Sequence, residues 1–338
     1  MTYYRRRAEE APDLRPNSRD LPGGTMQFTN RVTQMLGVDT PIVQAPMGWI
    51  ARSQLASAVS AAGAMGIIET SSGEIEAIRG EIAAMRKLTD KPFGVNIAQA
   101  FVRDPSLIDF VIDQGVKFVS TSAGDPRRYT ETLKAAGLTV FHVVPTLRAA
   151  EKAVAAGVDG LIVEGGEGGG FKGPRIVSSL VLLPLICSHF DVPVIAAGGI
   201  CDGASMAAAF ALGAEGVQMG TRMVSAAESP VHENWKQAIV NSAETDTVYI
   251  KGTDGPSFRA LRTSTTEALA AGEGQPMATL AGGVKKVYFG GEMEAGVALG
   301  GQVAGRIDSV KAVADIIADT VREYAEVVEG LSKQLPGN

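Results

Sequence analysis

A glycine-rich segment after an apolar run is the first candidate for chemistry in this sequence. It reads LIVEGGEGGGFKGP over residues 161–174, with five glycines around Glu167. Glycine loses more conformational freedom on folding than any other residue, so such a cluster is costly. One usual reason for it is a ligand that approaches the main chain closely. Glu167 is then a candidate for substrate binding, and a turn residue that caps the next helix is the alternative.

Two further glycine clusters indicate that the ligand carries a phosphate. Gly198 and Gly199 stand in AAGG, and Gly220 precedes Thr221 in QMGT. Main-chain N–H groups at a helix start can coordinate a phosphate without a lysine. In α/β barrels the loops after the last two strands usually form the phosphate site. We therefore expect a phosphorylated ligand between these two loops.

His142 and Lys172 are the candidates for proton transfer. His142 ends an apolar run, so we expect either a proton donor in the site or a buried, hydrogen-bonded histidine. Lys172 would act as a base only if burial lowered its pKa. The three histidines lie far apart and no HxH, HExxH or CxxC spacing occurs, so no metal site is predicted. No GxSxG nucleophile is present, and GGEGGG lacks the acidic partner of a dinucleotide site.

These residues follow apolar segments that alternate with helical patterns. The eight predicted strands cover residues 41–46, 64–70, 92–98, 116–122, 138–144, 158–165, 192–199 and 214–220. The segments between them carry apolar residues at helical spacing, and several end in a glycine, as helices often do. Eight such units favour a (β/α)8 TIM barrel over an open doubly wound sheet, with the active site at the C-terminal ends of the strands.

The remaining segments are predicted to surround this barrel. Residues 1–26 are interpreted as an N-terminal extension. Residues 226–300 are richer in charge and glycine and are predicted to form a helical lid after strand eight. Residues 301–335 are predicted to return as a long amphipathic helix, so that residues 27–225 and 301–338 make up the barrel domain.

Composition narrows the functional classes. The 338 residues are 45% hydrophobic and carry a net charge of −6, which argues against nucleic acid or an anionic membrane as partner. No run of about 18 apolar residues predicts a membrane span. Two cysteines imply no disulfide framework and favour a reducing cytoplasm. We expect a small-molecule substrate and leave a homo-oligomer open.

Six segments, in this order, resemble the nitronate monooxygenase family, formerly called 2-nitropropane dioxygenase. They read PIVQAPMGWIARSQLASAVSAAGAMGIIE, KPFGVNIA, VEGGEGGG, VPVIAAGGICDG, GAEGVQMGTR and GQVAGRI, within about residues 28–330. The family also includes flavin-dependent enoyl-acyl-carrier-protein reductases and NADH:quinone reductases. The motifs are specific for this superfamily and much less specific for the reaction.

The resemblance implies an FMN-binding TIM barrel with a helical lid. It assigns a set of residues to the flavin ring, its polar edge and its phosphate. These cofactor-binding candidates are Ala45, Pro46, Met47, Asn96, Gly169, Gly170, Ala197, Gly198, Gly199, Met219, Gly220 and Thr221.

One departure from the family pattern bears on the reaction. The family's glycine loop usually continues as GGH, with that histidine as the expected acid or base, whereas this chain has Phe171 there. A phenyl ring moves no proton, so Phe171 is expected only to contact the substrate, and Lys172 is the candidate replacement. Oxidation of an already anionic nitronate with O2 needs no strong base and is the first hypothesis. An NADH- or NADPH-dependent reductase of a quinone or enoyl thioester, and a non-catalytic flavin- or phosphate-binding protein, are the alternatives.

Overall fold

Eight short parallel strands form a barrel in the computed structural model, which describes residues 28–335. The strands are β1 (Ile42–Gln44), β2 (Gly66–Ile68), β3 (Phe93–Ala98), β4 (Phe118–Ser122), β5 (Thr139–Val144), β6 (Gly160–Glu164), β8 (Val194–Ala197) and β9 (Gly216–Met219). They pair in the order β1-β9-β8-β6-β5-β4-β3-β2, and a parallel bridge between Val43 and Met65 closes the ring. The predicted (β/α)8 barrel is confirmed.

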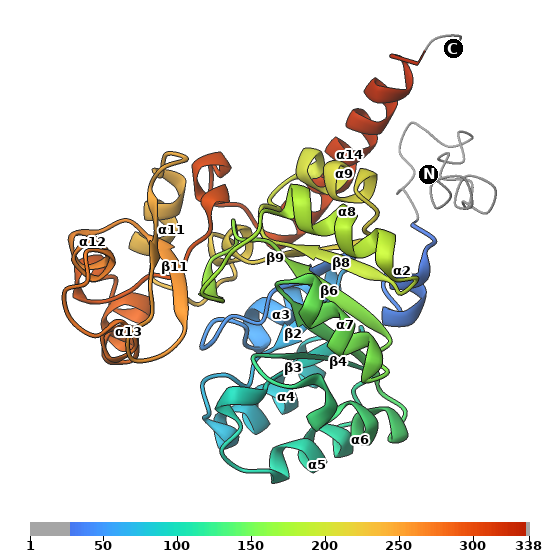
Figure 1. Ribbon diagram of the computed structural model, residues 1–338, viewed down its shortest axis with the longest axis horizontal. Helices are drawn as coiled ribbons and strands as arrows, with labels where there is room; N and C mark the ends of the chain where they lie inside the picture. The colour runs from blue at the N-terminus through green and yellow to red at the C-terminus, as the bar shows by residue number, and fades with distance from the viewer. Residues whose placement is uncertain (1–27, 336–338) are drawn as a thin grey trace.

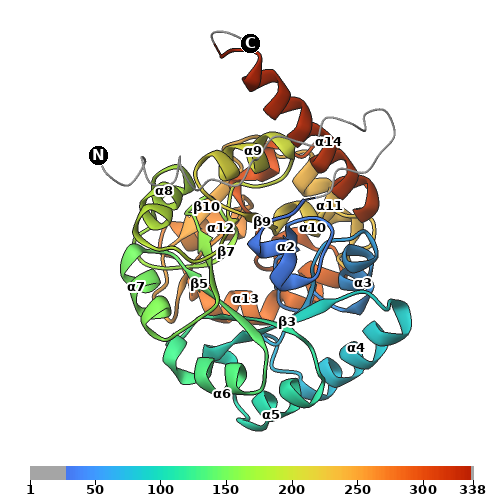
Figure 2. The same ribbon diagram turned by 90° about the vertical axis from the view of Figure 1, so that its right-hand side faces the viewer.

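Helices surround the strands in a ring when the molecule is viewed along the barrel (Figure 2). They are α3 (Ser53–Ala61), α4 (Ile75–Leu88), α5 (Ser106–Asp113), α6 (Thr130–Ala135), α7 (Leu147–Ala155), α8 (Ser179–His189) and α9 (Gly203–Ala211), with short 3-10 turns η1 (Gln99–Phe101) and η2 (Pro126–Arg128). Gly63 and Gly157, which follow α3 and α7, both have φ of 81°. This left-handed geometry is the helix-ending role that the sequence predicts for these glycines.

Side chains fill the barrel interior toward the N-terminal ends of the strands, and the barrel opens toward their C-terminal ends. Phe118 and Phe141 meet edge to face inside the barrel, with ring centroids 5.5 Å apart. The short helix α2 (Arg31–Leu36) adds Val32 and Leu36 to the same apolar cluster. In Figure 2, α2 lies across the end of the barrel that faces the viewer. The N-terminal ends of the strands are thereby closed, which leaves the C-terminal ends for a site.

The insertion after strand eight contains strands as well as helices. It holds α11 (Glu233–Val240), β10 (Thr247–Ile250), β11 (Ser257–Leu261), α12 (Ser264–Ala270), α13 (Pro276–Val284), the π-helix η3 (Lys285–Phe289) and the 3-10 turn η4 (Met293–Ala295). Strands β10 and β11 form an antiparallel hairpin, and β11 also pairs with β7 (Gly170–Lys172) from the glycine-rich segment. The predicted helical insertion after strand eight thus also contains a β-hairpin, which the sequence analysis did not predict. Figure 1 shows this unit to one side of the barrel.

The C-terminal segment returns to the barrel later than predicted. After β9 comes the one-turn helix α10 (Thr221–Val224), and after the insertion a 3-10 turn η5 (Gln302–Arg306). The long helix α14 covers only Val313–Ser332, so the predicted helix from residue 301 is wrong in its first 12 residues. Its first half packs against α9 and α3, and Figure 1 shows its end extending beyond the barrel. Residues 1–26, predicted as an extension, lie outside the described residues.

Within residues 28–335 we find no helix with the length and hydropathy needed to cross a lipid bilayer.

Candidate active site

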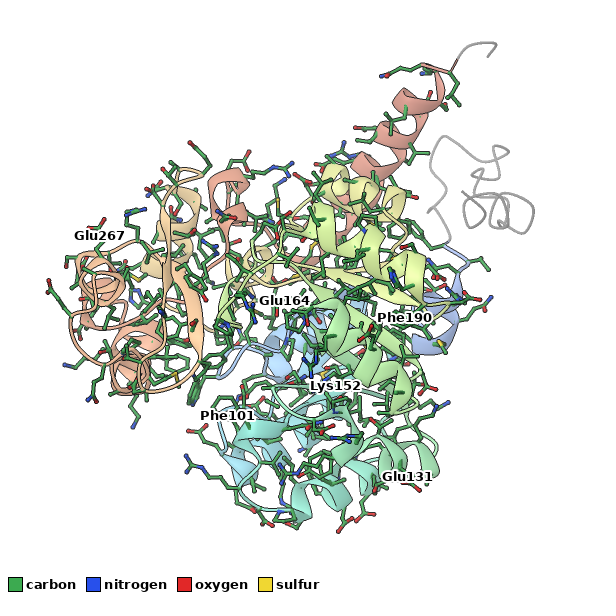
Figure 3. The ribbon with its side chains drawn as sticks, in the orientation of Figure 1. Phe101, Glu131, Lys152, Glu164, Phe190 and Glu267 are labelled. Carbon is green, nitrogen blue, oxygen red and sulfur yellow. The ribbon has the colours of Figure 1, made fainter. Side chains whose placement is uncertain are left out.

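A cavity of about 570 Å³ opens at the C-terminal ends of the barrel strands. Glu164 ends β6 at this cavity, and Figure 3 shows it between the barrel and the insertion, with Glu267 on the insertion's far side. Most of the predicted site residues line it. They are Ala45, Pro46, Met47, Asn96, His142, Gly169, Gly170, Phe171, Lys172, Ala197, Gly198, Gly199, Gly220 and Thr221. The fold thus brings these separate motifs to one place.

Main-chain donors face one end of this cavity. Gly198 and Gly199 have φ of 84° and 81°, a left-handed backbone that favours glycine. Among the described residues, the N–H groups of Gly199, Gly220 and Thr221 donate to no protein acceptor. The Thr221 hydroxyl accepts a hydrogen bond from the Gly301 N–H at 2.9 Å, so its own proton is free to be donated. Four unused donors on two adjacent loops form a seat for a phosphate-sized anion.

Gln218 is a cavity residue that the sequence analysis missed. It lines the cavity from β9, is 8% exposed, and its Oε1 is buried without a hydrogen-bond partner among the described residues. Strand alternation could have revealed it, because Gln218 stands between the buried Val217 and Met219. Asn96, by contrast, already has a protein partner, because its amide donates a hydrogen bond to the Ser120 hydroxyl at 3.0 Å. A polar ligand beside Gln218 would satisfy the orphaned oxygen.

Lys172 is held in an ion pair rather than free to act as a base. Its Nζ donates to Glu164 Oε1 at 2.5 Å and to the Gly169 carbonyl at 3.2 Å, and the residue is 8% exposed. An ion-paired ammonium has no lone pair with which to accept a proton. The geometry therefore does not support Lys172 as a substitute for the family histidine.

His142 is buried on β5 as a neutral imidazole. It is 4% exposed, and its Nδ1 lies 2.7 Å from the Thr121 hydroxyl oxygen. Burial lowers the pKa of His142 to about 4, and the charge of Asp125 opposes this shift only in part. At neutral pH the side chain thus carries no proton that it could readily give up as an acid. The hydrogen-bonded, buried histidine is the alternative that the structure favours.

Phe171 forms an apolar wall of the cavity. Its ring lies 5.6 Å from that of Phe101, which belongs to the barrel turn η1. On β7 it stands opposite Phe258 of β11. Phe171 therefore lies between Phe101 of the barrel and Phe258 of the insertion. The family pattern has an ionisable side chain at this position.

Two predicted site residues lie elsewhere. The Glu167 carboxylate accepts hydrogen bonds from the Ser179 N–H at 2.9 Å and the Ser179 hydroxyl at 3.0 Å, at the first turn of α8. It does not line the cavity, so the structure favours the capping role over substrate binding. Met219 is fully buried in the core, and only its carbonyl, which accepts from the Ala45 N–H, supports the site.

Glu69 fixes two loops at the rim of the cavity. This fully buried carboxylate accepts from the Trp49 N–H at 3.2 Å and the Ser72 N–H at 2.8 Å. It also lies 3.0 Å from the Arg52 guanidinium. Trp49 has φ of 61°, a strained value for a bulky residue. The carboxylate thus holds the loop after β1 in a conformation that it would not adopt alone.

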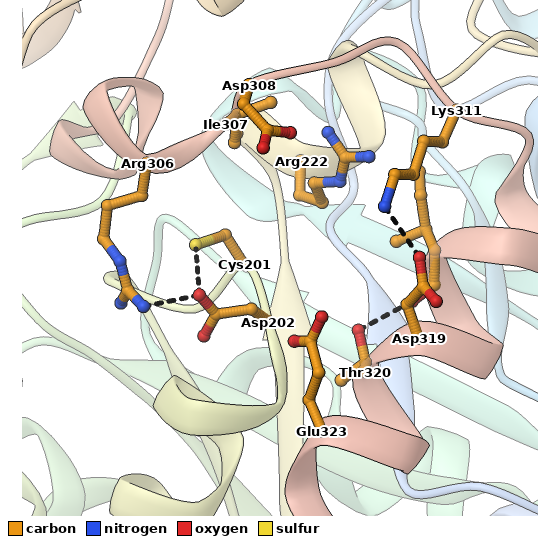
Figure 4. Close-up of a pocket in the computed structure, with 11 residues that line it drawn as sticks. Cys201, Asp202, Arg222, Arg306, Ile307, Asp308, Lys311, Asp319, Thr320 and Glu323 are labelled. Carbon is orange, nitrogen blue, oxygen red and sulfur yellow. Dashed lines mark hydrogen bonds and ion pairs between the residues drawn. The ribbon is translucent and has the colours of Figure 1, made fainter.

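A smaller cavity of about 200 Å³ is lined by Arg222 together with Cys201 and Asp202 (Figure 4). Arg222, next to Thr221, is buried there, and its Nη1 donates to the Ser309 carbonyl at 2.8 Å and the Ser225 hydroxyl at 3.2 Å. Burial lowers the pKa of Arg222. Burial raises the pKa of the neighbouring Cys201 to about 12, so this thiol is unreactive. Arg222 thus ties the seat to the returning C-terminal segment.

Comparison with known proteins agrees with this geometry. The chain matches the nitronate monooxygenase family model over residues 29–109 and 98–323. It belongs to this family. Nitronate monooxygenase from Paraburkholderia phytofirmans is 30% identical over 88% of this chain and 95% of that protein. The FabK structure from Thermotoga maritima shares 40% identity and a TM-score of 0.86, over 91% of this chain and 100% of that one.

A further relative in this family has a different named activity. The (3aS,4S,5R,7aS)-5-hydroxy-7a-methyl-1-oxo-octahydro-1H-indene-4-carboxyl-CoA dehydrogenase from Rhodococcus jostii is 37% identical over 70% of this chain and 67% of that protein. The chain is an oxidoreductase enzyme of the nitronate monooxygenase family, as the resemblance implied. The alternative of a non-catalytic flavin- or phosphate-binding protein is therefore not supported. The expectations about compartment, nucleic acid and oligomeric state stay predictions.

Proposed function

We propose that the enzyme uses FMN to oxidise alkyl nitronates with O2 and leaves the parent nitroalkanes unreacted. The observation that carries this proposal is that the described residues of the cavity wall include no unpaired side chain with the basicity of an ordinary histidine. Phe171 occupies the place of the family histidine, Lys172 and Glu164 are ion-paired with each other, and burial lowers the pKa of His142 to about 4. A nitroalkane must lose a proton from carbon before oxidation, whereas a nitronate has already lost it.

FMN fits the residues that are present. The phosphate would be held by the N–H groups of Gly199, Gly220 and Thr221 and by the Thr221 hydroxyl. The orphaned Gln218 oxygen would accept from a ring N–H. A volume of about 570 Å³ is within the range of cofactor and ligand pockets. When bound, the flavin would supply the electron transfer between substrate and O2.

The protein side chains would position the substrate and exclude water. Phe101 and Phe171 form the apolar wall against which an alkyl chain would pack. The Lys172–Glu164 pair would add a polar, net uncharged edge beside it. The neutral His142 would keep its hydrogen bond to Thr121 throughout, without gaining or losing a proton. In this arrangement the enzyme binds a reactive anion and performs no proton abstraction itself.

Anaerobic mixing tests the proposal. The FMN-loaded protein is mixed with propionate 3-nitronate or with 3-nitropropionate, and loss of the visible flavin absorption is followed. We expect the nitronate to bleach the flavin and the nitro compound to leave it unchanged. Equal bleaching by both compounds would refute the missing-base argument.

Two variants of Phe171 supply the matched control. Phe171→His restores an imidazole at the family position, and a general base typically accelerates proton abstraction by about 100-fold or more. We expect this variant to gain bleaching by 3-nitropropionate. Phe171→Leu opens the same position without a titratable group and should not gain it. If both variants gained bleaching by 3-nitropropionate, the size of the Phe171 side chain, and not the missing base, would explain why wild type rejects the nitro compound.

A reductase is the second candidate. Within the described residues, Lys172 and Glu164 are the charged side chains that line the cavity, and they neutralise each other. An uncharged quinone or enoyl thioester suits such a cavity, and the 37% identical relative is named as a carboxyl-CoA dehydrogenase. Bleaching of the flavin by NADH or NADPH alone would favour this reaction over the first.

A further inference from the structure

Tyr288 presents a hydroxyl group to the cavity from the insertion. It belongs to the π-helix η3, lines the cavity, and is 2% exposed. Among the described residues its hydroxyl has no hydrogen-bond partner. A hydroxyl that borders a cavity and has no protein partner is free to form a hydrogen bond with a ligand there.

The neighbours of Tyr288 fix the ring in place. Trp235 packs edge to face against it, with centroids 4.5 Å apart, and Trp49 lies 6.2 Å away on the barrel side. Trp49 is itself held by the buried Glu69. Single π-turns inside helices are frequent at functional sites, because they displace one side chain from the regular helical face. Packing against Trp235 of the insertion and Trp49 of the barrel therefore fixes the orientation of the hydroxyl, and no hydrogen bond to the protein does so.

The phenol keeps the proton that it would donate to a ligand. Burial raises the pKa of Tyr288, and the negative charge of Glu69 raises it further. The group thus stays protonated and neutral at physiological pH. A neutral donor in a largely desolvated site interacts most strongly with an oxygen that carries negative charge.

We propose that the Tyr288 hydroxyl binds the substrate by donating a hydrogen bond to an sp2 oxygen that carries full or partial negative charge. This inference rests on the proposed function, in which that oxygen belongs to the nitronate group. For the reductase the same chemistry would be supplied by a thioester or quinone carbonyl. Tyr288 is then the recognition element that the insertion contributes to a barrel-based site.

Tyr288→Phe isolates the hydroxyl from the packing. The FMN-loaded variant and wild type are mixed anaerobically with a series of propionate 3-nitronate concentrations, and the bleaching rate gives Kd and the limiting rate. A hydrogen bond to a charged group predicts a Kd higher by about 10-fold to 100-fold in the variant. FMN affinity and thermal unfolding should stay unchanged, because the ring contacts remain. An unchanged nitronate Kd would overturn the proposal.

Tyr129→Phe is the matched control. Its hydroxyl likewise has no partner among the described residues, but it is buried in the protein, and Tyr129 lies at the start of α6 and does not line the cavity. We expect its nitronate Kd to equal that of wild type, and an equal loss in both variants would refute the specific role. Failure of nitronate to bleach wild type would instead refute the proposed reaction. In that case the KM of wild type and of Tyr288→Phe for an enoyl thioester or quinone is measured with NADPH as reductant. An unchanged KM in the variant would refute the role of the Tyr288 hydroxyl.

Discussion

His142 offers a direct test of the electrostatics of the cavity wall. The pKa of His142 is about 4 in the folded protein because burial disfavours the charged imidazole, whereas an unfolded histidine titrates near 6.5. The test replaces it by Asn, which does not titrate and retains an amide that can hydrogen bond to Thr121. Any cost of the smaller side chain is independent of pH, so it cancels when the two proteins are compared across a pH series.

The sign and size follow from proton binding. Between pH 6.5 and 4 the unfolded His142 binds a proton that the folded one does not, so wild type loses stability as pH falls through this window. Relative to pH 7.5, this loss is about 1 kcal/mol at pH 5.5 and about 2–3 kcal/mol at pH 4.5, with a limit of about 3 kcal/mol in stronger acid. The His142→Asn variant lacks this contribution entirely.

Urea unfolding at pH 7.5, 5.5 and 4.5, with the same FMN concentration throughout, measures the difference. The free energies of unfolding of wild type and His142→Asn should converge as pH falls, by the amounts given above. All other titrating groups contribute equally to both proteins. Parallel pH dependences would mean that the folded imidazole is protonated near its ordinary pKa, and His142 would return as a candidate acid.

Two further substitutions address the ion pair and the phosphate seat. Glu164→Gln leaves the nearly buried Lys172 ammonium without its counter-charge, so we expect a loss of about 3 kcal/mol in urea unfolding and a smaller loss for Lys172→Met, because the remaining carboxylate is 25% exposed. Equal losses would contradict this ordering. Gly199→Ala meets no atom closer than 3.8 Å and should lose about 1–2 kcal/mol from its left-handed backbone, with weaker FMN binding. Gly198→Ala should lose more, because its Cβ would lie 2.9 Å from the Gly165 carbonyl oxygen, and the reverse order would refute the seat geometry.

The features predicted from sequence are those that local chain chemistry determines. Buried parallel strands are apolar over their whole length, and the helices between them end at left-handed glycines, so the order of the barrel elements could be read directly. The C-terminal ends of the strands then follow from the fold class. Gly198, Gly199 and Gly220 could be assigned to one site for this reason, although they are separated by up to 22 residues of sequence.

The features that sequence did not predict depend on pairing between distant segments. The hairpin β10–β11 has the Asp-Gly turn signal at residues 254–255, but charge and glycine around it suggested a helical lid. The pairing of β7 with β11 is not encoded in either strand alone. The Lys172–Glu164 contact and the desolvation of His142 likewise depend on residues that are brought together only in the folded protein. Proton-transfer roles therefore could not be assigned from residue type and motif position.

The barrel and the insertion contribute different chemistry to the site. The barrel loops supply main-chain donors, which do not depend on side-chain identity, whereas the insertion supplies the Tyr288 hydroxyl and fixes Phe171 through the β7–β11 pairing. Substitutions on the insertion side can thus change the substrate without disturbing the phosphate seat. Two relatives, at 30% and 37% identity, carry different named activities. We infer that the reaction of this enzyme is decided by the few side chains that meet between β7, η3 and the loop after β1.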